Sequence, residues 1–179
     1  MFGVDDPDPR WLHHGVIEFA PTESRASWVY VTSGYSNPWH KAPEEYSPDG
    51  DSGAGLEFIM ETDRQGDWAI VHLRRMLVLQ LLLESARIAG NGPLGPGDRI
   101  PLKEPIDWVD GHEVQNLMTM TAEWPEFTLP SGGVMFVQFI GLTNAEVEFA
   151  KANGSPAILE QLKAGGAVPV IVPDRASLI

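Results

Sequence analysis

Cysteine is absent from this chain of 179 residues. The absence excludes disulfides, a cysteine nucleophile and any thiolate metal site. It suits a reducing compartment, and we expect a cytoplasmic protein. Long hydrophobic runs are also missing, because the longest, residues 76–83, contains Gln80 and is far shorter than the roughly 20 residues that cross a bilayer. We therefore expect no membrane partner.

Positive charge is scarce, with 12 Lys and Arg against 25 Asp and Glu and a formal net charge of −13. Such a chain repels phosphate backbones at long range, so we do not expect a nucleic-acid partner. A basic protein or peptide is the better electrostatic match. The alternative is that the acidic surface serves solubility alone.

The hydrophobic pattern predicts two parts of unequal size. Residues 1–10 are acidic and proline-rich, lack the features of a secretory signal, and are expected to form a loose N-terminal arm. Residues 11–179 are expected to form a single domain. Six strands are predicted within it, at residues 14–19, 27–33, 55–61, 114–121, 133–142 and 168–172. The apolar run 133–142 belongs at the centre of a sheet, whereas Pro169 places the last strand at an edge.

A long helix is expected from Asp67 to Ala89, with Asp67 as its N-cap. It is apolar on most faces, which predicts a sheet on one side and other elements on the other. Two short helices follow. Thr143 and Glu146 form a capping box for the first, and Ser155 is the predicted N-cap of the second. The predicted class is α+β: a mixed, largely antiparallel sheet packed against one long buried helix, with two short C-terminal helices.

Candidate catalytic groups are few. The alternating pattern of residues 55–61 places Phe58 and Met60 inward and Glu57 and Glu61 outward, in a solvated acidic rim. The histidines have no metal-ligand spacing, and His72 in the long helix is more often a packed, hydrogen-bonded residue than a ligand. Neither a GxSxG elbow nor a phosphate-binding loop ending in GK[ST] occurs. We expect no cofactor, no metal and no enzymatic activity.

Two alternatives to a binding protein stay open at this point. One is an unrecognised hydrolase or metal-dependent enzyme that uses some of Glu57, Glu61, His72 and His112. Convergence of these side chains in one concave pocket would favour it, and scattered positions would count against it. The other is a structural or oligomerisation domain.

Residues 34–53 are predicted to form a long loop, because they contain three prolines and the turn pair Asp49-Gly50. A loop of this length inside a compact domain is often functional. It carries two aromatic residues among four acidic ones: Trp39, Tyr46, Glu44, Glu45, Asp49 and Asp51. Amphipathic rings beside carboxylates are good anchors for a protein partner, so these six residues are the predicted binding site. The alternative is that the rings only pin the loop to the domain.

Several motifs in this order resemble the suppressor-of-fused domain. They are WVYVTSGYSNPW, DGDSGAGLEFIME, the long helix, GPGDRIPL, the segment from LPSGGVMFVQFIGLT to the last helix, and VIVPDR. Together they cover the chain from about Asp5 to Arg175. The resemblance implies an α+β fold without known enzymatic activity. In animal members the domain cooperates with a second one to clamp a peptide of a transcription factor as an added strand.

The same resemblance implies functional residues. The family's partner-contacting aromatic residue matches Trp39, where the animal protein has tyrosine, and its acidic contact matches Asp49. The sequence carries no counterpart of the second clamping domain. Bacterial members are similar to immunity proteins, which neutralise a toxin by binding it. The resulting expectation is a non-enzymatic, protein-binding module, in its most specific form an immunity protein with a basic toxin as partner.

Overall fold

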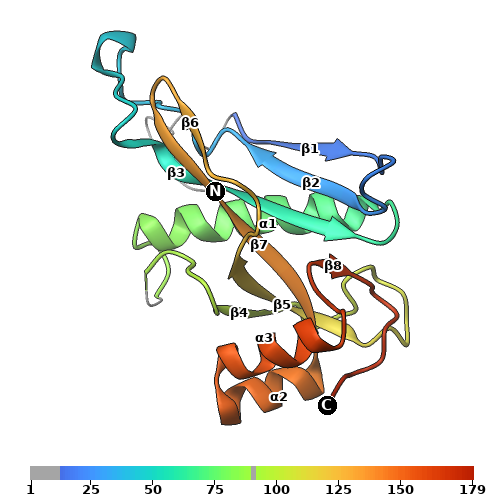
Figure 1. Ribbon diagram of the computed structural model, residues 1–179. Helices are drawn as coiled ribbons and strands as arrows, with labels where there is room; N and C mark the ends of the chain where they lie inside the picture. Colours follow the sequence, from blue (N-terminus) through green and yellow to red (C-terminus); the bar gives the residue numbers. More distant parts are fainter. Residues whose placement is uncertain (1–12, 90–91) are drawn as a thin grey trace.

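The computed structural model describes residues 13–89 and 92–179 (Figure 1). The arm predicted for residues 1–10 lies outside this range. The strands of the described residues are β1 (Gly15–Phe19), β2 (Trp28–Ser33), β3 (Asp51–Thr62), β4 (Arg99–Pro101), β5 (Val114–Thr121), β6 (Phe127–Leu129), β7 (Gly132–Thr143) and β8 (Val170–Ile171). The helices are the 3-10 helix η2 (Pro43–Glu45) and the α-helices α1 (Asp67–Glu84), α2 (Asn144–Asn153) and α3 (Ser155–Ala164).

All the described strands belong to one mixed sheet. Its main path is β1-β2-β3-β7-β5-β4, while β6 pairs with β7 and β8 pairs with β3. The pairings are antiparallel except those of β3 with β7 and with β8, which are parallel. This arrangement confirms the predicted α+β class and the predicted central place of the apolar run 133–142, because β7 lies between β3 and β5.

The helices lie on both faces of the sheet. Trp68 and Leu77 of α1 pack against Phe58 of β3 in the main core. The pair α2 and α3 covers part of the other face, where Leu162 packs with Ile140 of β7 in a second core. Phe139 of β7 belongs to the main core and its neighbour Ile140 to the second. Since neighbouring residues of a strand point to opposite faces, the two cores lie on opposite sides of the sheet. Figure 1 shows α2 and α3 beside β4 and β5, well away from α1.

The helix α1 differs from the prediction at both ends. Its N-cap is Gly66 and not Asp67, and it ends at Glu84 instead of Ala89. Glycine is needed at the cap because a Cβ on Gly66 would lie 2.1 Å from Nε1 of Trp68. Similarly, Gly154 and not Ser155 caps α3, and the hydroxyl of Ser155 instead donates to a main-chain carbonyl in another part of the chain.

Only one side of α1 is buried. The expectation that other elements pack on most faces of this helix is therefore wrong. Its inner face is buried, whereas Arg74, Arg75 and Val78 on its outer face are exposed, Val78 by 42%. Among the described helices, none has the length and apolar character that a bilayer span requires. The predicted capping box of Thr143 and Glu146 is confirmed for α2.

The same Glu146 fastens the C-terminal segment to the domain. It is fully buried and forms a two-pronged ion pair with Arg175, with N···O distances of 2.6 and 2.7 Å. It also accepts the N–H groups of Thr143 at 2.8 Å and Leu178 at 3.1 Å. Burial alone would raise the pKa of Glu146, but these partners outweigh it and lower the pKa below its ordinary value.

Candidate functional site

The base of the loop between β2 and β3 is built around Glu57. This residue is only 4% exposed, so the prediction that it points to solvent is wrong. Its carboxylate accepts hydrogen bonds from Oγ1 of Thr32 at 2.5 Å, from the N–H of Gly34 at 3.0 Å, and from the N–H and Oγ of Ser36 at 2.8 and 2.7 Å. A buried carboxylate is tolerated only when such donors replace water. Glu57 therefore fixes the turn that opens the loop.

A second set of contacts fastens the far end of the loop. Oγ of Ser52 donates to the carbonyl of Ser36 at 2.7 Å and lies 2.6 Å from Oγ of Ser131. Next to it, Gly53 has a φ of +58°, and a Cβ there would lie 2.4 Å from the carbonyl oxygen of Asn37. Only glycine fits this position without strain. The serines and glycines of the SGYS and DSGAGLE motifs thus hold both ends of the loop against one another.

Trp39 is half-buried on this base. Its indole N–H donates to the carbonyl of Gly34 at 2.9 Å, and its ring stacks on His13 with 5.1 Å between the centroids. The ring also lines a cavity of about 360 Å³, to which Lys41 and Glu84 of α1 contribute. Trp39 is therefore anchored to the loop while part of it remains available at the surface.

The acidic residues of the predicted site lie along the same loop, mostly outside that cavity. Glu44 and Glu45 are exposed in η2, Asp49 is exposed just before β3, and Asp51 is exposed as the first residue of β3, so the loop ends at residue 50 and not at 53 as predicted. Tyr46 is half-buried at the end of η2. Of the six predicted residues, the cavity lining includes Trp39 alone. Figure 1 shows the loop projecting from the end of the sheet where β3 begins.

A lysine and a histidine that were not among the predicted site residues accompany these carboxylates. Nζ of Lys41 donates to the main-chain carbonyl of Asp51 at 3.1 Å, and His40 is exposed beside it. Glu84 enters the cavity from the end of α1, and nothing in its local sequence indicates this position. The burial of Glu57, in contrast, has an indication in the sequence. The SGYS turn supplies Gly34 and Ser36 as hydrogen-bond donors to its carboxylate.

The four side chains of the enzyme alternative do not meet. Glu61 is also buried, not exposed as predicted, and accepts hydrogen bonds from Ser27 at 2.8 Å and Gln138 at 3.2 Å. Glu57 and Glu61 alternate with the core residues of β3, so they point away from α1, which carries His72. Each carboxylate has its own set of neutral donors, around Glu57 from Thr32, Gly34 and Ser36 and around Glu61 from Ser27 and Gln138.

The histidines have separate structural partners. Nε2 of His72 lies 2.8 Å from the carbonyl oxygen of Ile106, and its burial lowers its pKa below the ordinary value. His112 pairs instead with Asp107, with 2.9 Å between Nδ1 and Oδ2. Within residues 13–89 and 92–179, no three His, Asp or Glu side chains are grouped so that they could hold a metal ion. The geometry thus gives these residues structural roles.

Comparisons with known proteins agree with this architecture. The sequence profile of the family described as "Suppressor of fused protein (SUFU)" matches residues 10–176. The sequence matches no curated protein. Among solved structures, a chain of the Sufu-Fu complex has a TM-score of 0.64 and 18% identity, over 92% of this chain and 76% of that chain.

Two further solved structures share the fold. Drosophila Suppressor of Fused has a TM-score of 0.60 and 19% identity, over 92% of this chain and 42% of that one. This chain therefore spans less than half the length of the Drosophila protein. A protein described as a SUFU homologue from Neisseria gonorrhoeae has a TM-score of 0.61 and 16% identity, over 95% of this chain and 91% of that one.

Proposed function

The chain belongs to the suppressor of fused family, and from this premise we propose that it acts by binding another protein, without catalysing a reaction. We define the loop surface as residues 37–51, and assign the contact to it. A solved member of the family is held in a complex with Fu, which supports protein binding as a mode of action for this fold. The scattered positions of Glu57, Glu61, His72 and His112 support a non-enzymatic role.

One observation carries the proposal: the loop between β2 and β3 is exposed and rich in carboxylates, and hydrogen bonds fix it to the domain at both of its ends. A loop ordered before binding loses less conformational entropy when it meets its partner. Trp39 offers an amphipathic ring, and Glu44, Glu45 and Asp49 offer negative charge. A basic partner surface complements this arrangement and is attracted at long range by the net charge of −13.

The test compares two single carboxylate deletions that change the net charge equally. Asp49→Ala removes an exposed acid from the loop surface, and Glu160→Ala removes an exposed acid from α3. Proteins captured by the wild-type chain from its native cell are identified, and the affinity of each purified partner for both variants is measured by calorimetry. We expect Asp49→Ala to weaken binding about tenfold, as for a charge pair worth roughly 1.4 kcal/mol, and Glu160→Ala to leave it unchanged.

Stability measurements separate a binding role from a structural one. Asp49 is exposed, so its replacement should change the free energy of unfolding by less than about 0.5 kcal/mol. Trp39→Ala removes the bond to Gly34 and the stacking on His13, and should therefore cost both affinity and about 1–2 kcal/mol of stability. A partner that binds both loop variants as tightly as wild type would contradict the assignment of the loop surface.

In its most specific form, we propose that the partner is a basic toxin and that the chain is its immunity protein, which acts in the cytoplasm. The exposed carboxylates and the net charge support this choice of partner. Co-expression of the chain with a toxin encoded beside its gene should restore growth, and Asp49→Ala should weaken the protection. A captured partner without toxicity would refute the immunity role and leave the binding function standing.

A further inference from the structure

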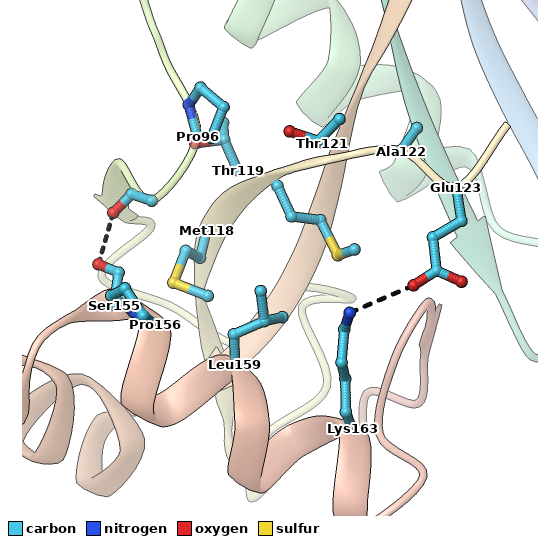
Figure 2. A pocket seen from close by; sticks show the side chains of 12 residues that line it. Pro96, Met118, Thr119, Thr121, Ala122, Glu123, Ser155, Pro156, Leu159 and Lys163 are labelled. Atoms are coloured by element: carbon cyan, nitrogen blue, oxygen red, sulfur yellow. Dashed lines mark hydrogen bonds and ion pairs between the residues drawn. The ribbon is translucent and has the colours of Figure 1, made fainter. Parts of the chain in front are cut away.

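A groove separate from the loop surface lies between β5 and α3 (Figure 2). Its volume is about 410 Å³. Met118 and Met120 of β5, which are 1% and 5% exposed, line one wall, and Pro156 and Leu159 of α3 line the other. Methionine side chains are flexible and polarizable, so a wall of this kind adapts to apolar groups of different shape.

The groove runs along an open part of the edge of β5. On this side of β5 the strand β4 pairs only with residues 116–118, and the main chain of Thr119 then exchanges hydrogen bonds with Gly97 and Asp98. Gly97 has a φ of +92°, and the chain leaves β5 at this point. In the described part of the chain, no strand pairs with this edge beyond Thr119.

The main chain of Thr121 points to this open edge. In an antiparallel ladder, successive residues direct their N–H and C=O groups to opposite sides. Ala122 donates its N–H to β7, and Thr119 bonds on the opposite side, so Thr121 shares the direction of Thr119. Thr121 is exposed. A strand edge with a free donor and acceptor is a template for another extended chain.

Contacts at both ends limit the length of the groove. At one end, Oγ of Ser155 donates to the carbonyl of Gly97 at 2.7 Å. At the other, Nζ of Lys163 lies 3.2 Å from Oε1 of Glu123. The dashed line in Figure 2 marks this ion pair. Because this exposed pair places one positive and one negative charge at the rim, the groove itself offers no net charge to a ligand.

We propose that this groove binds a short extended segment of another protein, which adds as an antiparallel strand beside Thr121. To pair with the main-chain N–H and C=O of Thr121, a ligand needs an acceptor and a donor in its own backbone. To fill the groove between the apolar walls, it also needs nonpolar side chains next to that backbone. A polypeptide supplies both. The groove is thus a second protein-binding surface, selective for apolar side chains where the loop surface is selective for positive charge.

The strand geometry determines the pattern of the bound segment. A residue paired with Thr121 directs its side chain to the same face as Thr121 does, away from Met120. Its two neighbours point to the opposite face, which carries Met120 and, across the groove, Leu159. The segment therefore has an apolar residue on each side of a central residue that is free to be polar, as in Leu-Thr-Leu.

The experiment uses defined peptides and the full chain. Ac-Ser-Leu-Thr-Leu-Ser-NH2, and analogues with Phe or Met in place of Leu, are titrated into ¹⁵N-labelled protein while the amide resonances are followed by NMR. The matched control peptide carries an N-methyl group on the central threonine, which removes the donor for Thr121 and keeps both leucines. We expect shifts at Met120, Thr121 and Ala122 with the first peptide, and about tenfold weaker binding of the control.

Protein variants test the walls and separate this surface from the first one. Leu159→Glu places a charge in the groove and should weaken binding by at least about tenfold, and Leu159→Ala should weaken it less. Asp49→Ala should leave peptide binding unchanged. Added salt should also leave it unchanged, whereas binding at the loop surface should weaken.

Three results would overturn the proposal. The first is the absence of shifts at millimolar concentrations of all three peptides. The second is equal binding of the N-methylated control, which would mean apolar contact without strand pairing. The third is a shift of the same amides with protein concentration alone, because a second copy of the chain would then occupy the edge. None of these results bears on the loop surface, which the Asp49→Ala comparison tests independently.

Discussion

Replacing Glu57 by alanine should be among the most damaging changes of a single charged residue in this domain. The carboxylate accepts four hydrogen bonds at a site that is 4% exposed. Two of the donors are hydroxyls, of Thr32 and Ser36, which can rotate to other acceptors. The other two are the N–H groups of Gly34 and Ser36, which are fixed by the backbone.

The size of the loss follows from these donors. A buried donor left without an acceptor costs about 1–3 kcal/mol, so two fixed donors cost about 2–6 kcal/mol. Water that enters the space left by the side chain recovers part of this cost, and we expect Glu57→Ala to lower the free energy of unfolding by about 2–5 kcal/mol. Glu57→Gln keeps one oxygen, enough for the three donors on Oε1, and should cost only about 1–2 kcal/mol.

Urea unfolding of the two variants measures both losses. With a slope of about 2–3 kcal/mol per molar urea, the midpoint for Glu57→Ala should fall by about 1–2 M. Hydrogen exchange gives the residue-level readout, because the amides of Gly34 and Ser36 should lose protection before the rest of the sheet. The matched control is Glu44→Ala, at an exposed position in η2. A loss below about 1 kcal/mol for Glu57→Ala would show that the carboxylate does not hold the loop.

Three further predictions concern Arg175, His72 and Gly53. Arg175→Met leaves the carboxylate of Glu146 buried without its cation and should cost about 3–5 kcal/mol in chemical denaturation; an unchanged midpoint would mean that the ion pair is dispensable. His72 has a lowered pKa in the fold and its ordinary value of 6.5 when unfolded, so the unfolded chain binds more protons as pH falls. Stability should therefore decrease below about pH 6.5, less steeply in His72→Leu, and equal slopes for the two proteins would disprove this account. Gly53→Ala combines a positive φ with a Cβ 2.4 Å from a carbonyl oxygen and should lower the free energy of unfolding by about 2–4 kcal/mol; a thermal midpoint equal to that of wild type would refute the proposed strain.

Features determined by neighbouring residues were predictable from the sequence. The capping box of Thr143 and Glu146 is a local exchange of hydrogen bonds, and the structure has it as predicted. The near-continuous apolar run of β7, broken by Gln138, predicted burial on both faces, and α1 and α3 supply it from opposite sides. The three-residue strands β4 and β6 were missed, because segments so short form only through pairing with β5 and β7.

The errors arose where distant segments decide the outcome. Alternation correctly placed Glu57 and Phe58 on opposite faces of β3, but it carried no information on what covers each face. The turn at residues 33–36 covers Glu57, and Gln138 and Trp124 cover Glu61. For the loop surface, the sequence indicated which residues the loop carries, whereas the cavity beside Trp39 depends on the end of α1.

The parallel neighbours of β3 have a consequence for synthesis of the chain. β3 pairs with β7 and β8, and both are translated long after it. A nascent chain therefore holds Phe58 and Met60 without their β7 partners, Val137 and Phe139, until β7 has left the ribosome. Such non-local pairing makes folding slow and leaves apolar strands open to aggregation in the meantime. Premature termination before β7 would release a fragment that lacks the middle of its sheet, so we expect truncated products to be degraded and not to survive as smaller folded units.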